Sequence, residues 1–137
     1  MKLLQTLTQT PSVPGREDRI RKVIQDYVTK HKLFDEVTVD SMGSLIGVRK
    51  PRPASGKTQK KPIRVMLAAH MDQIGFLVRH IDESGYLRLN PVGGFDARNL
   101  FARKVRVCTA HGDLPGILNA SGKPIHKVED WPKTPAA

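Results

Sequence analysis

The sequence has one cysteine, no long apolar run and no clear secretion signal, and each shortage excludes a class of protein. Cys108 alone cannot form a disulfide within the 137 residues, which favours a reducing, cytoplasmic setting. No stretch of about 18 apolar residues occurs, so we expect no membrane span. The opening "MKLLQTLTQTPSVPG" has one lysine and an apolar patch broken by polar residues, unlike a secretory leader.

Acidic residues are also scarce: 13 Asp and Glu face 23 Lys and Arg, for a net charge of +10. Seven of the bases lie in Arg49–Arg64, "RKPRPASGKTQKKPIR", which has no acid, so the rest of the chain carries only +3. Its prolines, Gly, Ser and Thr are typical of a solvated loop between strands. No aromatic residue alternates with these bases to stack on a single strand. A basic nucleic-acid-binding domain is therefore the least favoured of the hypotheses below.

One helix is predicted in the first third of the chain. Apolar residues recur at helical spacing from Ile20 to Val28. Gly15 precedes the pattern, and Glu17 and Asp18 would lie in the first turn, where the helix dipole favours anions. We predict a helix over Arg16–His31.

The next segments have the patterns of strands. The stretch "EVTVDSMGSLIGVRK" contains two apolar runs around Ser41–Gly43, which predicts a β-hairpin. After the basic segment, "IRVMLAA" (residues 63–69) is a nearly continuous apolar run of strand length. Such a run is typical of a strand buried on both faces, as in an α/β sheet.

From Gly75 onward only strand patterns occur. "GFLVRHIDESGYLRLNPVGG" contains two runs joined at Glu83–Gly85, and "ARKVRVCTAHGDLPGILNA" contains two joined at His111–Asp113. We therefore place a boundary between Asp72 and Gly75, with an α/β part before it and a β-rich part after it.

His70 and Asp72 are the strongest candidates for a site. They follow the predicted buried strand, and α/β folds bind ligands at the carboxyl ends of their strands. At spacing two in an extended chain, both side chains point the same way, so the carboxylate can hold one ring nitrogen and leave the other for a metal. A strand-end histidine before an exposed turn aspartate is the alternative, and this spacing alone does not decide. The other histidines lack such a setting: His31 ends a helix, His80 lies in a strand, His111 in a turn, and His126 has no second histidine at metal spacing.

The sequence around His70 and Asp72 resembles a known family. "LAAHMDQIGFLVRHIDESGYLRLNPVGGFDARNLFARKVRV" closely resembles the glutamyl and deblocking aminopeptidases, a family of dinuclear metallopeptidases that form hollow tetrahedral particles. "LLQTLTQTPSVPGREDRIRKVI", "VTVDSMGSLIG" and "GILNASGKPIH" extend the resemblance in the family's order. Ser44 departs from the pattern, since an Asn usually follows the glycine there, and the basic segment is longer than usual.

The resemblance implies roles for two residues. His70 matches the family's first metal ligand and Asp72 the catalytic-site aspartate that orients it, while the substrate-binding residues stay unknown. The family site holds two divalent metals, zinc or cobalt, and its other ligands and general base follow "KPIH". Glu129 and Asp130 do not replace them, because the tail "KVEDWPKTPAA" does not resemble the family. One histidine cannot hold a catalytic zinc, which needs about three protein ligands.

The resemblance also implies a fold. Residues 1–74 would begin an α/β/α peptidase sandwich, residues 75–125 would form an incomplete, inserted β-barrel-like domain for dimerisation and assembly, and residues 126–137 would be an unstructured tail. Strand edges and apolar faces left uncovered in such a truncated chain would make it poorly stable.

Three functions follow as hypotheses. The first is a metal-dependent aminopeptidase chain acting on peptides, truncated and inactive by itself, and joined to copies of itself through the β domain. The second is a non-catalytic oligomerisation module. The third is the basic nucleic-acid-binding domain.

Overall fold

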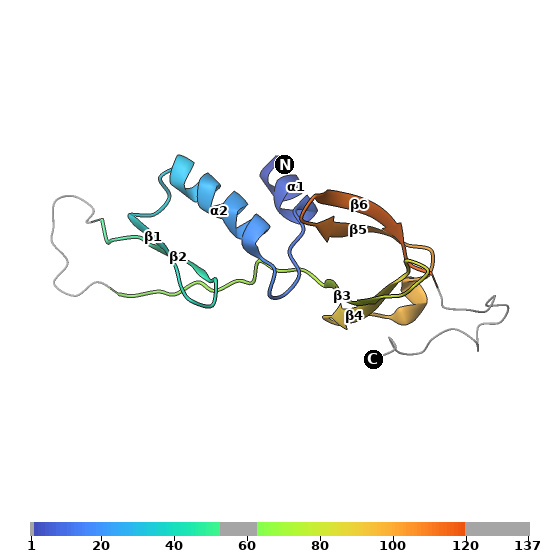
Figure 1. Cartoon of the computed structure of the whole chain (residues 1–137). Coiled ribbons are helices and arrows are strands. Elements are labelled where there is room, and N and C mark those ends of the chain that lie inside the picture. The colour runs from blue at the N-terminus through green and yellow to red at the C-terminus, as the bar shows by residue number, and fades with distance from the viewer. Residues whose placement is uncertain (1, 53–62, 120–137) are drawn as a thin grey trace. The chain divides into compact units, whose positions relative to one another are not determined.

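The computed structural model describes residues 2–52 and 63–119 and divides into two units. The N-terminal unit is Met1–Asp72 and the C-terminal unit is Gln73–Ala137, so the division lies in the interval where the sequence pattern changes. The elements, labelled in Figure 1, are α1 (Lys2–Gln9), α2 (Asp18–Lys30), β1 (Glu36–Val39), β2 (Leu45–Val48), β3 (Gly75–Ile81), β4 (Leu87–Val92), η2 (Ala97–Asn99), β5 (Lys104–Thr109) and β6 (Gly112–Ile117).

Helix α2 lies where a helix is predicted but begins two residues later, at Asp18. The cause is a turn before it: Gly15 has a φ of +78° and donates its N–H to the Glu17 carboxylate at 2.7 Å. Glu17 therefore caps the turn instead of joining the helix. Ile20 and Val28, on the apolar face of α2, are the buried hydrophobic residues of the described chain, at 2% and 8% exposure. The core of this unit is accordingly small.

The predicted hairpin after α2 is confirmed as the antiparallel pair β1–β2. Its turn has the sequence Asp-Ser-Met-Gly-Ser. Asp40 Oδ1 accepts the backbone N–H groups of Met42 at 2.9 Å and Ser44 at 2.8 Å. Gly43 takes a φ of +87°, which a residue with a Cβ adopts only with strain. Side chain and glycine together fix the turn.

Two contacts hold this hairpin to its surroundings. The Arg21 guanidinium, on α2, donates to the carbonyl of Gly43 at 3.2 Å. The ring of Phe34 covers Gly47 in β2 so closely that a Cβ there would come within 2.6 Å of ring carbons. The absence of a side chain at Gly47 therefore allows the Phe34 ring to pack against the backbone of β2.

The C-terminal unit contains the two other predicted hairpins. In β3–β4 the turn is Asp-Glu-Ser-Gly-Tyr, with the same geometry as in β1–β2. Asp82 Oδ1 accepts the N–H groups of Ser84 at 3.1 Å and Tyr86 at 2.9 Å. Gly85 has a φ of +81°. A register shift between Val78 and His80 marks a bulge in β3.

Hairpin β5–β6 turns through two residues, Ala110 and His111, one residue earlier than predicted. Gly112 then takes a φ of +128° and pairs with Thr109, whose hydroxyl donates to the Gly112 carbonyl at 2.6 Å. Each strand in the described part of the chain thus has a ladder with one neighbour only, in three two-stranded antiparallel sheets.

The connection from β4 to β5 is held by side chains of its own. The Phe95 ring stacks on Phe76 of β3, with centroids 4.6 Å apart. Asp96 accepts two guanidinium hydrogen bonds from Arg98, at 3.0 and 2.8 Å, and the Arg98 backbone N–H at 3.0 Å. The Arg98 guanidinium lowers the pKa of the Asp96 carboxyl below its ordinary value.

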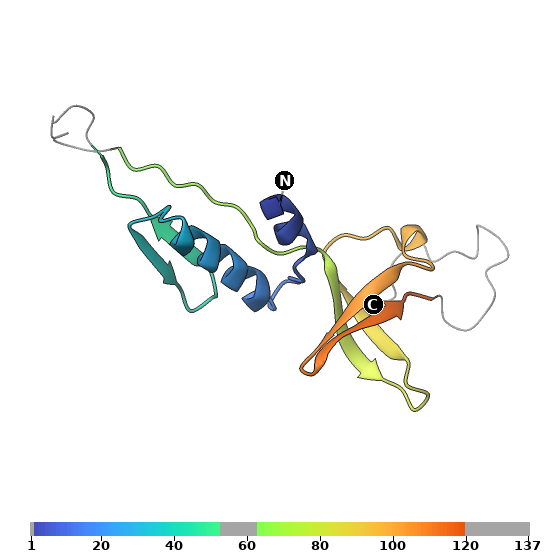
Figure 2. The same ribbon diagram turned by 90° about the horizontal axis from the view of Figure 1, so that it is seen from above.

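The buried strand predicted over residues 63–69 is wrong for this structure. The segment is extended but belongs to no strand (Figure 2). A strand buried on both faces needs a neighbour along its edge and a layer on each face. The described residues of this unit supply only one helix pair and one two-stranded hairpin. The exposed fractions are therefore large: 87% for Ile63, 78% for Val65, 88% for Met66 and 93% for Leu67.

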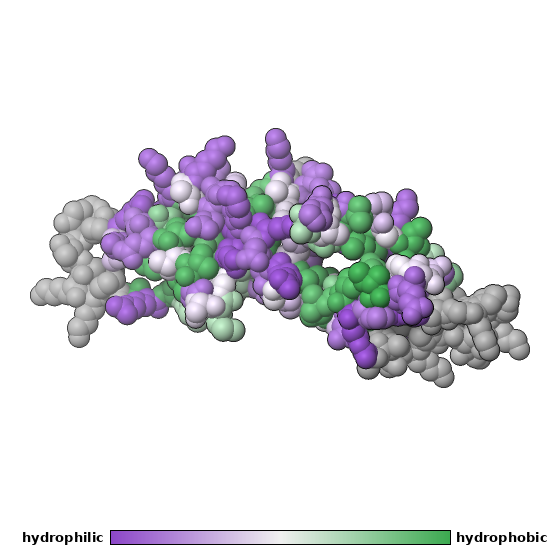
Figure 3. Space-filling view, viewed as in Figure 1, coloured by the Kyte–Doolittle hydropathy of each residue, from purple (hydrophilic) through white to green (hydrophobic). Residues whose placement is uncertain are grey.

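Hydrophobic side chains are exposed in both units, as the green patches of Figure 3 show. The described residues thus form an α/β chain with short sheets and a small core. Exposed positions outside residues 63–67 include Leu4, Met42, Ile74, Ile81, Tyr86, Leu114 and Ile117.

Candidate functional site

The His70 and Asp72 side chains meet, in the extended segment before the division between units. The His70 ring places Nδ1 3.1 Å from Asp72 Oδ1 and 3.0 Å from the Asp72 backbone carbonyl oxygen. Two oxygens facing one ring nitrogen require that nitrogen to donate, so in the neutral ring Nδ1 carries the proton. Nε2 then carries the lone pair. The His70 side chain is 83% exposed and that of Asp72 is 32% exposed.

The sequence predicts one of these two contacts. The carboxylate follows from the His-x-Asp spacing, whereas the carbonyl acceptor has no sequence signal, because every residue carries a carbonyl. Its position depends on the local backbone path after His70. The result is a ring held twice by one residue, with no third side chain required.

The His70–Asp72 pair could provide only one ligand of a divalent metal, the His70 ring. Metal-ligating histidines usually donate their other ring N–H to a carboxylate or carbonyl, as His70 does. A catalytic zinc needs about three protein ligands. Within residues 2–52 and 63–119, no group of three or more His, Cys, Asp or Glu side chains could hold a metal ion. The pair therefore fits one ligand and its orienting group, and a complete metal centre does not fit the described residues.

The other histidines are elsewhere. His31 is the C-cap residue that follows α2, and its ring centroid lies 4.3 Å from that of Tyr27. His80 is exposed in β3, and His111 is exposed in the β5–β6 turn. His126, Glu129 and Asp130 lie outside the described residues.

Acids of the β1–β2 hairpin pair with the first bases of the basic segment. Asp35 accepts the Lys50 backbone N–H at 2.7 Å, which lowers the pKa of Asp35, and lies 3.5 Å from the Arg52 guanidinium. The Lys50 ammonium lies 2.7 Å from the Glu36 carboxylate, and this hydrogen bond raises the pKa of Lys50. These two bases are already partnered, which disfavours a nucleic-acid role for them.

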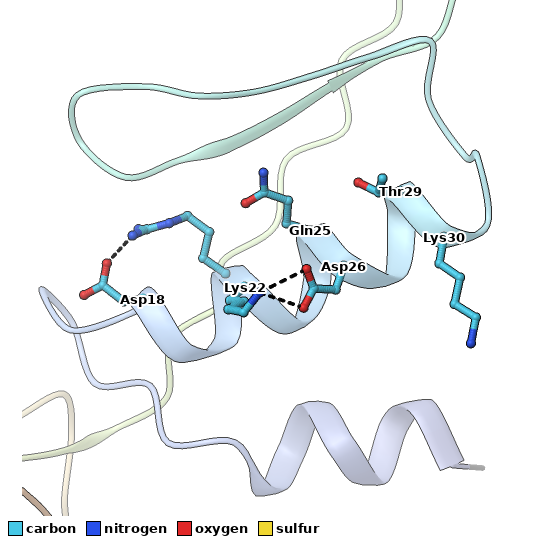
Figure 4. A pocket seen from close by; sticks show the side chains of 7 residues that line it. Asp18, Lys22, Gln25, Asp26, Thr29 and Lys30 are labelled. Carbon is cyan, nitrogen blue, oxygen red and sulfur yellow. Dashed lines mark hydrogen bonds and ion pairs between the residues drawn. The ribbon is translucent and has the colours of Figure 1, made fainter. Parts of the chain in front are cut away.

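An open hollow on the polar face of α2 is a poor alternative site (Figure 4). Its charges pair with one another: Arg21 with Asp18, and Lys22 with Asp26 at 3.1 Å. Such pairs three or four residues apart along one helix are common on protein surfaces. The rest of the rim is Gln25, Thr29 and Lys30.

The described residues contain no helix with the length and apolar character that crossing a membrane requires.

Comparison with known proteins decides the family. The sequence profile of the M42 glutamyl aminopeptidases matches residues 53–136. The chain belongs to this family. The M42 assignment agrees with the resemblance found in the sequence, and His70 and Asp72 lie inside the matched range.

Individual M42 relatives match over most of this chain. The lysyl aminopeptidase of Pyrococcus furiosus is 38% identical over 117 residues, which is 85% of this chain and 31% of that protein. The structure of aminopeptidase APDkam598 from Desulfurococcus kamchatkensis superposes with a TM-score of 0.76 at 34% identity, over 97% of this chain and 34% of its own. The Pyrococcus horikoshii TET1 peptidase, which can assemble into a tetrahedron or a large octahedral shell, has a TM-score of 0.71 at 33% identity, over 98% of this chain and 37% of its own.

The chain therefore spans about a third of the length of these relatives.

Proposed function

We propose that the chain is part of a metal-dependent aminopeptidase that hydrolyses N-terminal residues from peptides. Membership of the M42 family supports the activity, and the His70–Asp72 pair is the single observation that carries it to this chain's own residues. M42 peptidases generally depend on divalent metals.

In this proposal His70 offers Nε2 as one metal ligand and Asp72 keeps the ring in the tautomer that leaves Nε2 free. The family metals, zinc or cobalt, would polarise the peptide carbonyl and activate water when bound. Residues 1–137 tested alone should be inactive, because their described part provides no group of three potential metal-binding side chains.

The experiment uses a chimaera. Residues 1–119 replace the matching N-terminal segment of the Pyrococcus furiosus lysyl aminopeptidase, and hydrolysis of lysine, leucine and glutamate anilides is measured with zinc or cobalt. We expect turnover that His70→Ala abolishes and Asp72→Ala lowers about 10- to 100-fold, the usual cost of losing the partner that orients a ligand. His80→Ala, in an exposed strand position, is the matched control and should retain activity. An active chimaera that tolerates His70→Ala would contradict the proposal.

For the C-terminal unit we propose a role in self-assembly, as part of an inserted β-barrel-like domain. Support comes from the assembling TET1 relative and from the exposed apolar side chains of β3 and β6. If residues 1–137 join full-length copies without contributing to catalysis, the chain is instead a non-catalytic oligomerisation module. Size-exclusion chromatography with and without a full-length relative, combined with an activity assay, distinguishes the two roles. A non-catalytic module should elute with the larger particle of the full-length relative and leave the activity of that relative unchanged.

A cytoplasmic location fits the free, exposed thiol of Cys108.

A further inference from the structure

The backbone carbonyl of Asp72 makes a contact with the His70 ring that the His-x-Asp pattern does not assign. His70 Nδ1 lies 3.0 Å from this carbonyl oxygen and 3.1 Å from the carboxylate oxygen Oδ1 of the same residue. We propose that the carbonyl is a second positioning group for the ring, and that the distinct contribution of the carboxylate to a bound divalent metal is its negative charge. This division of roles rests on the proposed function, in which His70 Nε2 is a metal ligand.

The two oxygens of Asp72 share one N–H group of His70. A donor that faces two acceptors forms a three-centre hydrogen bond. When one acceptor is removed, the N–H can turn to the other, because both oxygens lie within hydrogen-bonding distance of Nδ1. Loss of the Asp72 side chain therefore still leaves an acceptor that keeps the proton on Nδ1.

The two acceptors differ in how they are held. The carbonyl belongs to the main chain, so the backbone path alone sets its position. The carboxylate also needs two fixed side-chain torsions, which cost conformational entropy. The Asp72 side chain is 32% exposed and that of His70 is 83% exposed, so water competes for the carboxylate. The carbonyl is therefore the more constant constraint on the ring.

The carboxylate differs from the carbonyl in its charge. A hydrogen bond to an ionised acceptor is roughly twice as strong as one between neutral groups. A carboxylate behind a ligating histidine also makes the other ring nitrogen a more basic donor to the metal. A neutral carbonyl holds the ring without adding this charge. Charge should therefore be the part of Asp72 that a metal detects.

Both contacts are local, since they join residues two apart in the sequence. They require no atom outside residues 70–72. The positioning can therefore be measured on the full chain of residues 1–137, without the other metal ligands of the family.

Long-range ¹H–¹⁵N correlation spectra of the metal-free chain test the carbonyl. Asp72→Asn keeps a side-chain oxygen acceptor but removes the charge, whereas Asp72→Ala removes both. With the rings neutral, we expect Asp72→Asn to keep the wild-type share of Nδ1–H at His70. Asp72→Ala should keep a share at least twice that of His80, the exposed β3 histidine observed in the same spectra. A share in Asp72→Ala no larger than that of His80 would overturn the role of the carbonyl.

A zinc titration followed at His70 tests the charge. Asp72→Asn and Asp72→Ala should weaken zinc binding at His70 by the same factor, about tenfold, because both remove the charge and neither removes the carbonyl. The zinc-induced shifts of His80 are the internal control and should match those of the wild type in both variants. Wild-type affinity in Asp72→Asn would refute the role of charge. A loss in Asp72→Ala ten times that in Asp72→Asn would return the positioning to the side chain.

Neither measurement depends on turnover. An active chimaera that tolerates His70→Ala would contradict the proposed function and leave the His70 tautomer as measured. A ring that loses its tautomer with the Asp72 side chain would overturn the carbonyl's role and leave the peptidase proposal standing.

Discussion

At the scale of single residues, short local sequences do most of the positioning. His70 needs only Asp72, two residues away, to orient its ring. This is why the pair could be predicted from the sequence, since its geometry follows from the period of an extended chain. Ligands contributed by distant segments have no such local signal, and in dinuclear sites they come from several elements.

The His70 tautomer is open to direct measurement. We expect the neutral His70 ring to carry its proton on Nδ1 to a greater extent than His80, whose ring is exposed in β3. Long-range ¹H–¹⁵N correlation spectra distinguish the two tautomers. Asp72→Ala should reduce the Nδ1–H share without abolishing it, because the backbone carbonyl still accepts. An unchanged share in Asp72→Ala would show that the carboxylate does not orient the ring.

The Asp40 turn should be sensitive to acid. Backbone N–H donors, that of Ser44 foremost, lower the pKa of Asp40 below its ordinary value of 3.8. Because the folded pKa is the lower one, ionised Asp40 stabilises the turn above pH 3.8, and this contribution is lost as the pH falls through the folded pKa. We expect the amide signals of Met42 and Ser44 to shift together with a midpoint below 3.8.

Asp40→Asn is the control for this titration. Its amide oxygen can accept the same two N–H groups but does not ionise over this pH range. The variant should keep the turn and show no acid transition at these amides. A transition that persists in Asp40→Asn would assign it to another group.

At the scale of elements, the hairpins follow from turn chemistry. Apolar runs on either side of Ser41–Gly43 and Glu83–Gly85 predict the β1–β2 and β3–β4 hairpins correctly. The helix start differs only because Glu17 closes a turn of its own. The strand predicted over residues 63–69 failed for the opposite reason. Its apolar pattern predicts that the segment is buried. Burial requires neighbouring strands and helices from distant parts of a sequence, and the described residues do not provide them.

The glycine requirement of the β3–β4 turn can be measured against a matched glycine. A Cβ at Gly85 or at Gly94 meets nothing within 4 Å, but only Gly85 has a positive φ, of +81°. Gly85→Ala should cost about 1 kcal/mol of backbone strain. Amide hydrogen exchange should then show about fivefold lower protection of the β3–β4 ladder. Gly94→Ala should leave it unchanged, and an equal effect of both would refute a conformational cause.

At the scale of the whole molecule, the described chain buries little. Its buried hydrophobic residues are Ile20 and Val28, and many large apolar side chains face solvent. Since apolar burial is the dominant stabilising term in folding, a core of this size should not unfold as one unit.

Thermal unfolding of residues 1–137 should therefore be broad. We expect a gradual loss of far-ultraviolet circular dichroism and binding of a hydrophobic dye at low temperature. Dilute samples keep self-association from contributing. A sharp, single transition without dye binding would show that the chain forms a larger core than its described residues contain.

The repeated Asp-x-x-Gly turn has one more consequence. Each ladder in the described chain joins only two strands, so no third strand restrains the alignment, and the five residues of the turn must set it. A deletion of one residue from such a turn would slide one strand by one position along the other. Because side chains alternate, every residue of that strand would exchange its inner face for its outer one. The length of the turn therefore determines which face of the hairpin each side chain occupies.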